Sequence, residues 1–244
     1  MRPIRRNTSP QNNDFDDYTE AKPFLISRLG SYCSYCERRI ATQLAVEHIQ
    51  PKGLSQYAHL IGRWSNFLLA CVNCNSTKKN KDVVLSRVLL PDRDNTFYAY
   101  IYSPDGKIET RNDLSPDVRM AAENTLRMVG LDKSSSQIHD ENGKMVAIDR
   151  YAQRMEVFLV AQSAKSDIAS NVGNDAVRRG AIRTAMGYGF FSIWMTVFAN
   201  DLDMQKSLVD AFNGTAASGC FDSNTMKPIS PAPNPDGLAH GGKI

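Results

Sequence analysis

The sequence contains no apolar stretch long enough to cross a bilayer. Its longest such run extends from Gly187 to Ala199 and is interrupted by Ser192 and Thr196, whereas a membrane-spanning helix needs ~20 apolar residues. The first twenty residues contain no apolar segment of the kind found in secretory signals. We therefore expect a cytoplasmic protein without a membrane segment.

The chain also lacks a strong excess of charge and any unusual composition. Its 244 residues are 42% hydrophobic and 23% charged, with a formal net charge of +3, which excludes a wholly disordered, collagen-like or coiled-coil chain. The positive charge is unevenly distributed, because residues 1–100 carry 14 Lys and Arg against 9 Asp and Glu. A local basic surface in this half would suit a polyanionic partner.

Cysteine is scarce, and its number is odd. The five cysteines include two C-x-x-C pairs, Cys33 with Cys36 and Cys71 with Cys74. An odd count without a secretion signal argues against a disulfide framework, and a redox C-x-x-C motif, the alternative, needs only one pair. Four thiolates in two such pairs suit one tetrahedral structural zinc ion. We expect Cys220 to take no part in the site.

Local sequence patterns predict a chain of mixed α and β structure without internal repeats. Apolar and β-branched runs indicate strands, Pro and Gly mark their turns, and Ser115 and Gly130 are typical of the two ends of a helix. The predicted elements are strands at 43–49 and 66–70, a helix at 75–90, a β-hairpin at 97–111, and helices at 115–130, 148–170, 174–200 and 204–212.

A carboxylate and a histidine are adjacent at the end of the first predicted strand, at Glu47 and His48. A carboxylate is a hard oxygen ligand suited to Mg²⁺, and an imidazole can accept a proton from water near neutral pH. Adjacent strand residues point to opposite faces, so a bend or a metal at the strand edge is needed before both can act on one phosphate. A surface carboxylate beside a packed histidine ring is the competing interpretation.

Taken in order, these motifs resemble the HNH endonucleases, whose catalytic unit is a ββα-metal fold. The shared pattern covers about residues 31–82 and reads C-x-x-C, acid-His-Ile-x-Pro, Asn with two hydrophobic residues, and C-x-x-C-Asn-x-x-Lys. The resemblance implies that His48 is the general base and that Asn66 orients it. It also implies that Glu47 and Asn75 bind a catalytic Mg²⁺ or Mn²⁺ ion.

Basic residues surround this pattern and are expected to hold a nucleic-acid backbone by ion pairing, without reading sequence. They are Arg38, Arg39, Lys78, Lys79 and Lys81. The lysine at position 78 falls where the family often has a phosphate-contacting lysine. A solvated helix face is the alternative interpretation of the lysine run.

Together these features predict an α+β protein: a zinc-stabilised ββα-metal HNH unit, a β-hairpin and a mainly helical C-terminal region. The domain boundaries expected from composition are a partly disordered segment at 1–30, the HNH domain at 31–90, the hairpin and helical domain at 91–221, and a disordered tail at 222–244.

The function that we expect is metal-dependent hydrolysis of phosphodiester bonds, with DNA favoured over RNA. A zinc-stabilised nucleic-acid-binding or scaffold module that has lost catalysis is the alternative. The segments PDRDNTF (residues 91–97) and AAENTLRMVGLD (residues 121–132) resemble the HNH subunits of bacterial anti-phage systems, and those of the Septu type most closely. That resemblance implies a role in antiviral defence and an ATPase as partner protein.

Overall fold

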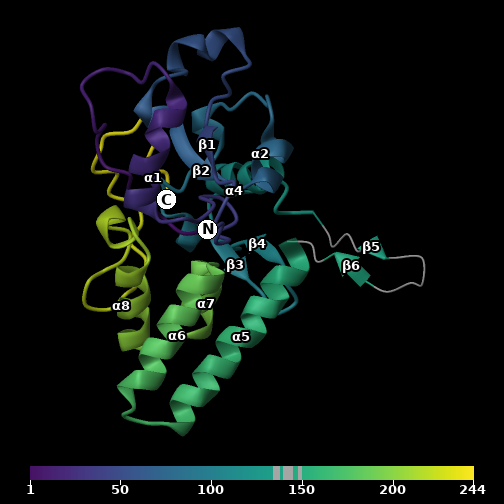
Figure 1. Cartoon of the computed structure of the whole chain (residues 1–244), viewed down its shortest axis with the longest axis vertical. Helices are drawn as coiled ribbons and strands as arrows, with labels where there is room; N and C mark the ends of the chain where they lie inside the picture. The colour runs from purple at the N-terminus through teal and green to yellow at the C-terminus, as the bar shows by residue number, and fades with distance from the viewer. Residues whose placement is uncertain (134–137, 140–144, 148–149) are drawn as a thin grey trace.

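The strands and the helix that carry the motifs form one unit in the computed structural model, which describes residues 1–133, 138–139, 145–147 and 150–244 (Figure 1). Strand β1 (Ala45–His48) pairs with β2 (Phe67–Ala70) in antiparallel register, and helix α2 (Val72–Lys78) follows β2 directly. The predicted ββα arrangement within a mixed α/β chain is therefore confirmed.

The remaining described elements are short in the first half of the chain and mainly helical in the second. They are the 3-10 helix η1 (Tyr18–Ala21), α1 (Lys22–Leu29), η2 (Ser55–Leu60), η3 (Trp64–Asn66), η4 (Leu85–Arg87), α3 (Thr96–Ala99), β3 (Tyr100–Tyr102), β4 (Ile108–Thr110), α4 (Pro116–Val129), β5 (Ile138–His139), β6 (Met145–Ala147), α5 (Arg150–Ser170), α6 (Asp175–Tyr188), α7 (Phe191–Val197), α8 (Leu202–Ala211) and η5 (Ala216–Ser218).

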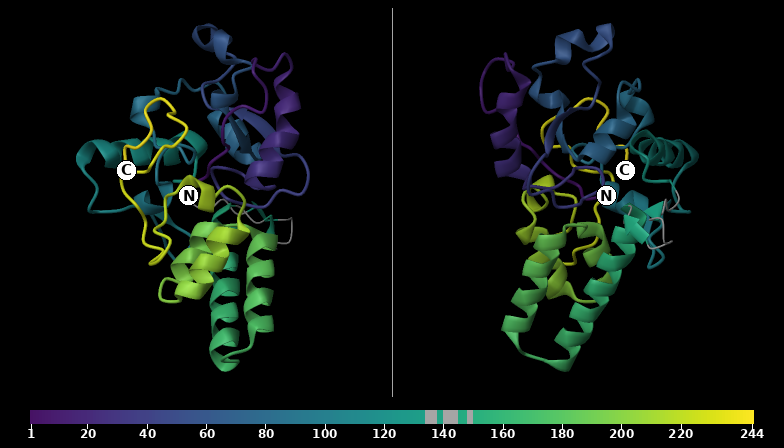
Figure 2. Two further views of the ribbon diagram at one scale, coloured as in Figure 1. Left: turned by 90° about the vertical axis from the view of Figure 1, so that its left-hand side faces the viewer. Right: turned by 45° about the vertical axis from the view of Figure 1, so that its right-hand side comes forward.

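Helices α5 and α6 form an antiparallel hairpin that projects from the body at the end opposite β1 and β2 (Figures 1 and 2). Helix α7 contacts α5, and α8 contacts α6. The aromatic side chains of Phe191, Trp194 and Phe212 are fully or almost fully buried at the base of these helices. Burial of such large apolar groups makes the main free-energy contribution to packing of the helical region against the rest of the chain.

Two predicted helices end earlier than expected. The helix predicted at 75–90 stops at Lys78, because Lys79 has a φ of 47°, a left-handed conformation that ends the helix. The helix predicted at 174–200 is split into α6 and α7 at Gly189. The φ of Gly189 is 80°, and a Cβ atom there would lie 2.3 Å from the carbonyl oxygen of Glu37. The chain therefore turns where glycine lets it pack against the first cysteine loop.

Both ends of the chain are packed against the body, which differs from the disorder expected for residues 1–30 and 222–244. Met1, Ile4 and Phe15 are buried in the N-terminal segment, and Ala232 and Ile244 in the tail. Polar side chains of these segments form hydrogen bonds in the fold. The side-chain nitrogen of Asn234 in the tail, for example, donates to the Leu238 carbonyl at 2.9 Å.

Candidate functional site

The four paired cysteines form one buried cluster. Their sulfur atoms all lie within 4.8 Å of one another, and the Cys36 and Cys71 sulfurs are 3.7 Å apart. A tetrahedral ZnS₄ site with Zn–S bonds of ~2.3 Å has sulfur–sulfur edges of about 3.8 Å, whereas a disulfide needs ~2.05 Å. The cluster therefore fits a structural zinc ion, and none of its cysteines is in a disulfide.

The cysteines of this cluster differ in their pKa shifts: burial raises the pKa of Cys33, and hydrogen bonds with the other cysteines raise that of Cys74. Hydrogen bonds with the other three thiols hold the pKa of Cys71 far below its ordinary value. The Arg150 guanidinium at the start of α5 donates to the Cys74 sulfur at 3.3 Å. Arg38 bonds the side chains of Asn73 (3.1 Å) and Gln153 (3.0 Å). Arg38 thus links α2 to α5. The sequence predicts only a contact between Arg38 and a nucleic-acid backbone.

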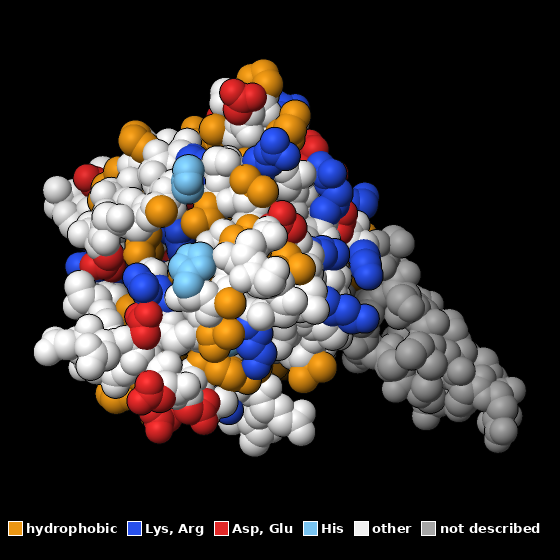
Figure 3. Space-filling model, turned by 90° about the horizontal axis from the view of Figure 1, so that it is seen from above, with side chains coloured by type: hydrophobic (Ala, Val, Ile, Leu, Met, Phe, Trp, Pro, Cys, Tyr) orange, Lys and Arg blue, Asp and Glu red, His pale blue; other side chains and the backbone are white. Residues whose placement is uncertain are grey.

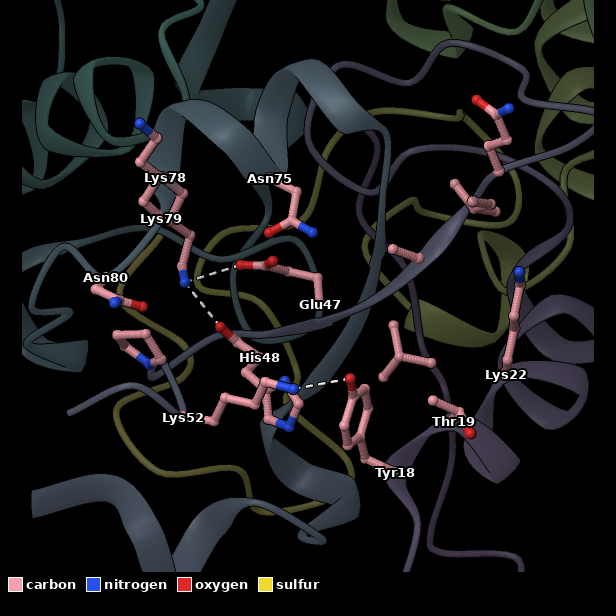
Figure 4. A pocket seen from close by; sticks show the side chains of 15 residues that line it. Tyr18, Thr19, Lys22, Glu47, His48, Lys52, Asn75, Lys78, Lys79 and Asn80 are labelled. Atoms are coloured by element: carbon pink, nitrogen blue, oxygen red, sulfur yellow. Dashed lines mark hydrogen bonds and ion pairs between the residues drawn. The ribbon is translucent and has the colours of Figure 1, made fainter. Parts of the chain in front are cut away.

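A hollow of about 560 Å³ lies beside the cluster, between the N-terminal segment, β1 and α2 (Figure 4). Glu47, His48 and Asn75 all line it. Glu47 and His48 therefore both border one hollow, although they are adjacent in strand β1. We call this hollow the cleft. It is lined by Tyr18, Thr19, Lys22, Gln43, Leu44, Ala45, Val46, Glu47, His48, Pro51, Lys52, Asn75, Lys78, Lys79 and Asn80.

The ring of His48 is held in one orientation by a hydrogen bond and by two aromatic neighbours. Its Nε2 lies 2.9 Å from the carbonyl oxygen of Ile61. Because a carbonyl can only accept, Nε2 must carry the proton, which leaves Nδ1 of the neutral ring as a proton acceptor. Tyr18 and Phe67 pack edge-on against the ring, at centroid distances of 4.7 and 5.2 Å. Burial lowers the pKa of His48 from its ordinary value, which favours the neutral ring.

Lys78 occupies a buried position between the two motif residues. Its ammonium lies 2.8 Å from Oε1 of Glu47 and donates to the His48 carbonyl at 2.7 Å. Burial raises the pKa of Glu47, and the charge of Lys78 opposes that rise. Lys78 is only 1% exposed, so it differs from the surface phosphate contact that we expected: it balances the charge of the carboxylate and fixes the end of β1.

Replacement of Lys78 by methionine should lower the free energy of unfolding by ~3–5 kcal/mol, because the Glu47 carboxylate would stay buried without its partner. Urea unfolding measures this change. The matched control is Lys79→Met at the exposed neighbouring lysine, for which we expect a change within ~0.5 kcal/mol. Equal losses in the two variants would contradict the assigned role of the buried pair.

Asn66 fixes the loop that joins β1 to β2. Its side-chain oxygen accepts from the Gln50 amide at 2.8 Å, and its side-chain nitrogen donates to the Gln50 carbonyl at 2.9 Å. Its own carbonyl accepts from the Ile49 amide at 2.9 Å. Asn66 therefore holds both residues that follow His48, which gives a physical basis to the orienting role implied by the resemblance.

The donor set in the cleft fits a small divalent cation. The carboxylate of Glu47 and the side-chain amide of Asn75 face one another across the cleft (Figure 4). Carboxylate and amide oxygens are the ligands that Mg²⁺ and Mn²⁺ prefer, with water filling the remaining positions.

Two basic residues of the cleft lie outside the predicted set. Lys22 and Lys52 line it together with the predicted Lys79, and Lys52 donates to the Tyr18 hydroxyl at 2.8 Å. Lys81 instead donates to the carbonyls of Arg127 (3.2 Å) and Met128 (3.1 Å) at the end of α4, a favourable place for a cation.

The surface at this end of the molecule is basic along one side. Figure 3 shows Lys and Arg side chains gathered there, while acidic side chains gather at another edge. Of the other predicted basic residues, Arg39 is exposed. No local pattern marks Tyr18 or Lys22, because both reach the cleft only through folding of the N-terminal segment.

Residues 33–81 match the HNH endonuclease family model. The HNH domain thus includes the whole cysteine cluster and Glu47, His48, Asn66 and Asn75. This match supports a nuclease or nucleic-acid-binding role, with nucleic acid as the ligand class. No curated protein matches the chain.

Among the residues that the structure describes, none of the helices is both long and apolar enough to cross a membrane.

Proposed function

We propose that the chain is a metal-dependent endonuclease that hydrolyses phosphodiester bonds in DNA. The observation that carries this proposal is the state of His48: its Nε2–H is committed to the Ile61 carbonyl, so Nδ1 is available as a base in a cleft that also holds Glu47 and Asn75. A general base of this kind contributes typically ~10²–10⁴-fold to a hydrolytic rate.

The residues divide the reaction between them. His48 takes a proton from the attacking water, and Asn66 holds the loop that places the ring. A Mg²⁺ or Mn²⁺ ion held by Glu47 and Asn75 would stabilise the charge on the phosphate and on the departing oxygen. Lys22, Lys52 and Lys79 offer positive charge to the backbone on either side of the scissile bond. Zinc on the cysteine cluster is structural.

A nucleic-acid-binding module without catalysis is the second candidate. A nicking assay separates the two: supercoiled plasmid is incubated with the protein across a titration of Mg²⁺ or Mn²⁺, and binding is followed in parallel. Metal-dependent conversion to nicked or linear DNA supports the nuclease. If the protein binds the plasmid but does not cut it at any metal concentration, the nucleic-acid-binding module without catalysis is the function that remains. Structured RNA in the same assay tests the preference for DNA.

A role in anti-phage defence is the wider proposal, and it is supported by the resemblance of residues 91–97 and 121–132 to Septu-type subunits. The hairpin of α5 and α6 projects away from the cleft (Figure 1), so an ATPase partner docked there would leave the cleft open. Loss of phage resistance in cells that carry His48→Ala would support this role. Full resistance in those cells would contradict it.

Lys52→Ala should weaken DNA binding and reduce its salt dependence. Each phosphate contact adds ~0.9 to the slope of log affinity against log salt for B-DNA, so loss of one contact lowers the slope by about that amount. Fluorescence anisotropy between 50 and 200 mM salt measures it. Lys107→Ala is the control, because Lys107 is exposed and pairs with Asp105 on the β3–β4 turn. An unchanged slope for Lys52→Ala would remove Lys52 from the binding surface.

A further inference from the structure

Two buried arginines converge on the backbone on either side of Asn66. Arg6 donates to the carbonyl of Phe67 at 2.5 Å and to that of Ser65 at 2.9 Å. Arg93 donates to the same Ser65 carbonyl at 2.8 Å. Both arginines lie outside residues 33–81, the part of the chain that matches the HNH model.

One aspartate holds the two arginines in place. Oδ2 of Asp92 lies 2.8 Å from Nη2 of Arg6 and 3.4 Å from Nε of Arg93. The side chain of Asp92 is fully buried, and the arginines are 1% and 5% exposed. Apolar side chains of similar volume often stabilise a fold equally well. What they cannot do is hold two carbonyl groups at fixed positions.

Hydrogen bonds and short backbone links connect these charges to the two residues that follow His48. The held carbonyls belong to the neighbours of Asn66, whose side chain bonds the amide and carbonyl of Gln50. The Asn66 carbonyl also accepts from the Ile49 amide. A shift of the chain at Ser65 or Phe67 therefore moves the loop that follows His48.

We propose that Arg6, Asp92 and Arg93 form a clamp of positioning residues that sets the place of His48 through Asn66. This proposal rests on the proposed nuclease function. The clamp gives the PDRDNTF segment a role, because two of its members are consecutive in that segment. A misplacement of ~1 Å at a reacting group can lower a rate ~10²-fold, so the clamp acts on turnover and leaves substrate binding unchanged.

The test compares Arg93→Met with Arg2→Met. Arg2 is an equally buried arginine that donates to the carbonyls of Leu29 (2.8 Å) and Asn213 (2.7 Å), away from Asn66. With the full chain, plasmid nicking gives kcat and KM, and zinc content and thermal unfolding are followed in parallel. We expect Arg93→Met to lower kcat by ~100-fold with KM within ~3-fold, and Arg2→Met to leave kcat within ~3-fold. Equal loss of kcat in both variants would overturn the clamp.

A double variant shows whether the effect passes through Asn66. In an Asn66→Ala background, Arg93→Met should lower kcat by less than ~3-fold further, because residues that act in one path are not additive. A full additional ~100-fold loss would overturn the proposed path. Where Arg93→Met does not fold, Arg93→Lys, which keeps the charge and one donor, replaces it in both comparisons.

A readout without catalysis separates this proposal from the proposed function. Amide hydrogen exchange at Ile49 and Gln50 should be ~10-fold faster in Arg93→Met than in Arg2→Met, because those amides donate to Asn66. Unchanged exchange overturns the clamp even in an active enzyme. Faster exchange in a wild-type chain that cuts nothing would sustain the clamp and refute the nuclease.

Discussion

Alanine in place of His48 should lower the rate of DNA cleavage by at least ~10²–10⁴-fold while zinc content, fold and DNA binding stay close to wild type. The reason is that Nδ1 of His48 is the proposed proton acceptor, and a general base supplies an effect of this size. The ββα unit is held by the cysteine cluster, the Glu47–Lys78 pair and Asn66. Cleavage rate and DNA affinity, measured on the same preparation, check both halves of the prediction.

Two further variants separate loss of the general base from other causes of inactivity. His59→Ala removes an exposed histidine from the loop between β1 and β2 and should cut normally. Glu47→Gln, which keeps a hydrogen-bond acceptor for Lys78, should also be inactive, but excess Mn²⁺ should restore part of its activity, since the change weakens binding of the ion and leaves proton transfer intact. The same excess should not restore His48→Ala. Normal cutting by His48→Ala would show that the histidine is structural.

Loss of zinc should unfold the HNH domain. Structural zinc contributes ~10–16 kcal/mol in small zinc-binding peptides, which equals or exceeds the net stability of ~5–15 kcal/mol of a typical protein. Cys36→Ser removes one of the four ligands of the buried cluster and should give aggregated or unfolded protein. Atomic absorption should find about one zinc ion per folded wild-type chain.

Cys220→Ser is the matched control for the zinc prediction. Cys220 is also a buried free thiol, but it lies outside the four-cysteine cluster. Its replacement should leave the zinc content at the wild-type value. Folded wild-type protein without zinc, or zinc lost from Cys220→Ser, would contradict the assignment of the cluster.

The parts of the fold set by local patterns could be predicted from the sequence. The C-x-x-C pairs, the two short strands and helix α4 depend on neighbouring residues. Helix α4 is the clearest example: it begins after Ser115 and ends at Gly130, which has the left-handed conformation expected of a C-terminal cap. The predicted Glu47, His48 and Asn75 likewise meet in one cleft. Their roles in chemistry stay predictions.

The parts that depend on distant segments could not be predicted. Tyr18 and Lys22 reach the cleft only because the N-terminal segment packs beside β1. The burial of Lys78 was missed for a related reason: a run of charged residues indicates an exposed face unless the facing carboxylate is known. The break at Gly189 depends in the same way on the close approach of Glu37.

The arginines near the start of the chain have a consequence for folding kinetics. Arg2 bonds Asn213 and Arg5 pairs with Asp236, partners 211 and 231 positions away. Contacts over such separations form slowly, whereas the ββα unit and the α5–α6 hairpin rely on local contacts. We therefore expect the docking of the N-terminal segment against the C-terminal part of the chain to be a late step in refolding. The rate at which activity returns after denaturation should follow that docking, and the return of helical signal should precede it.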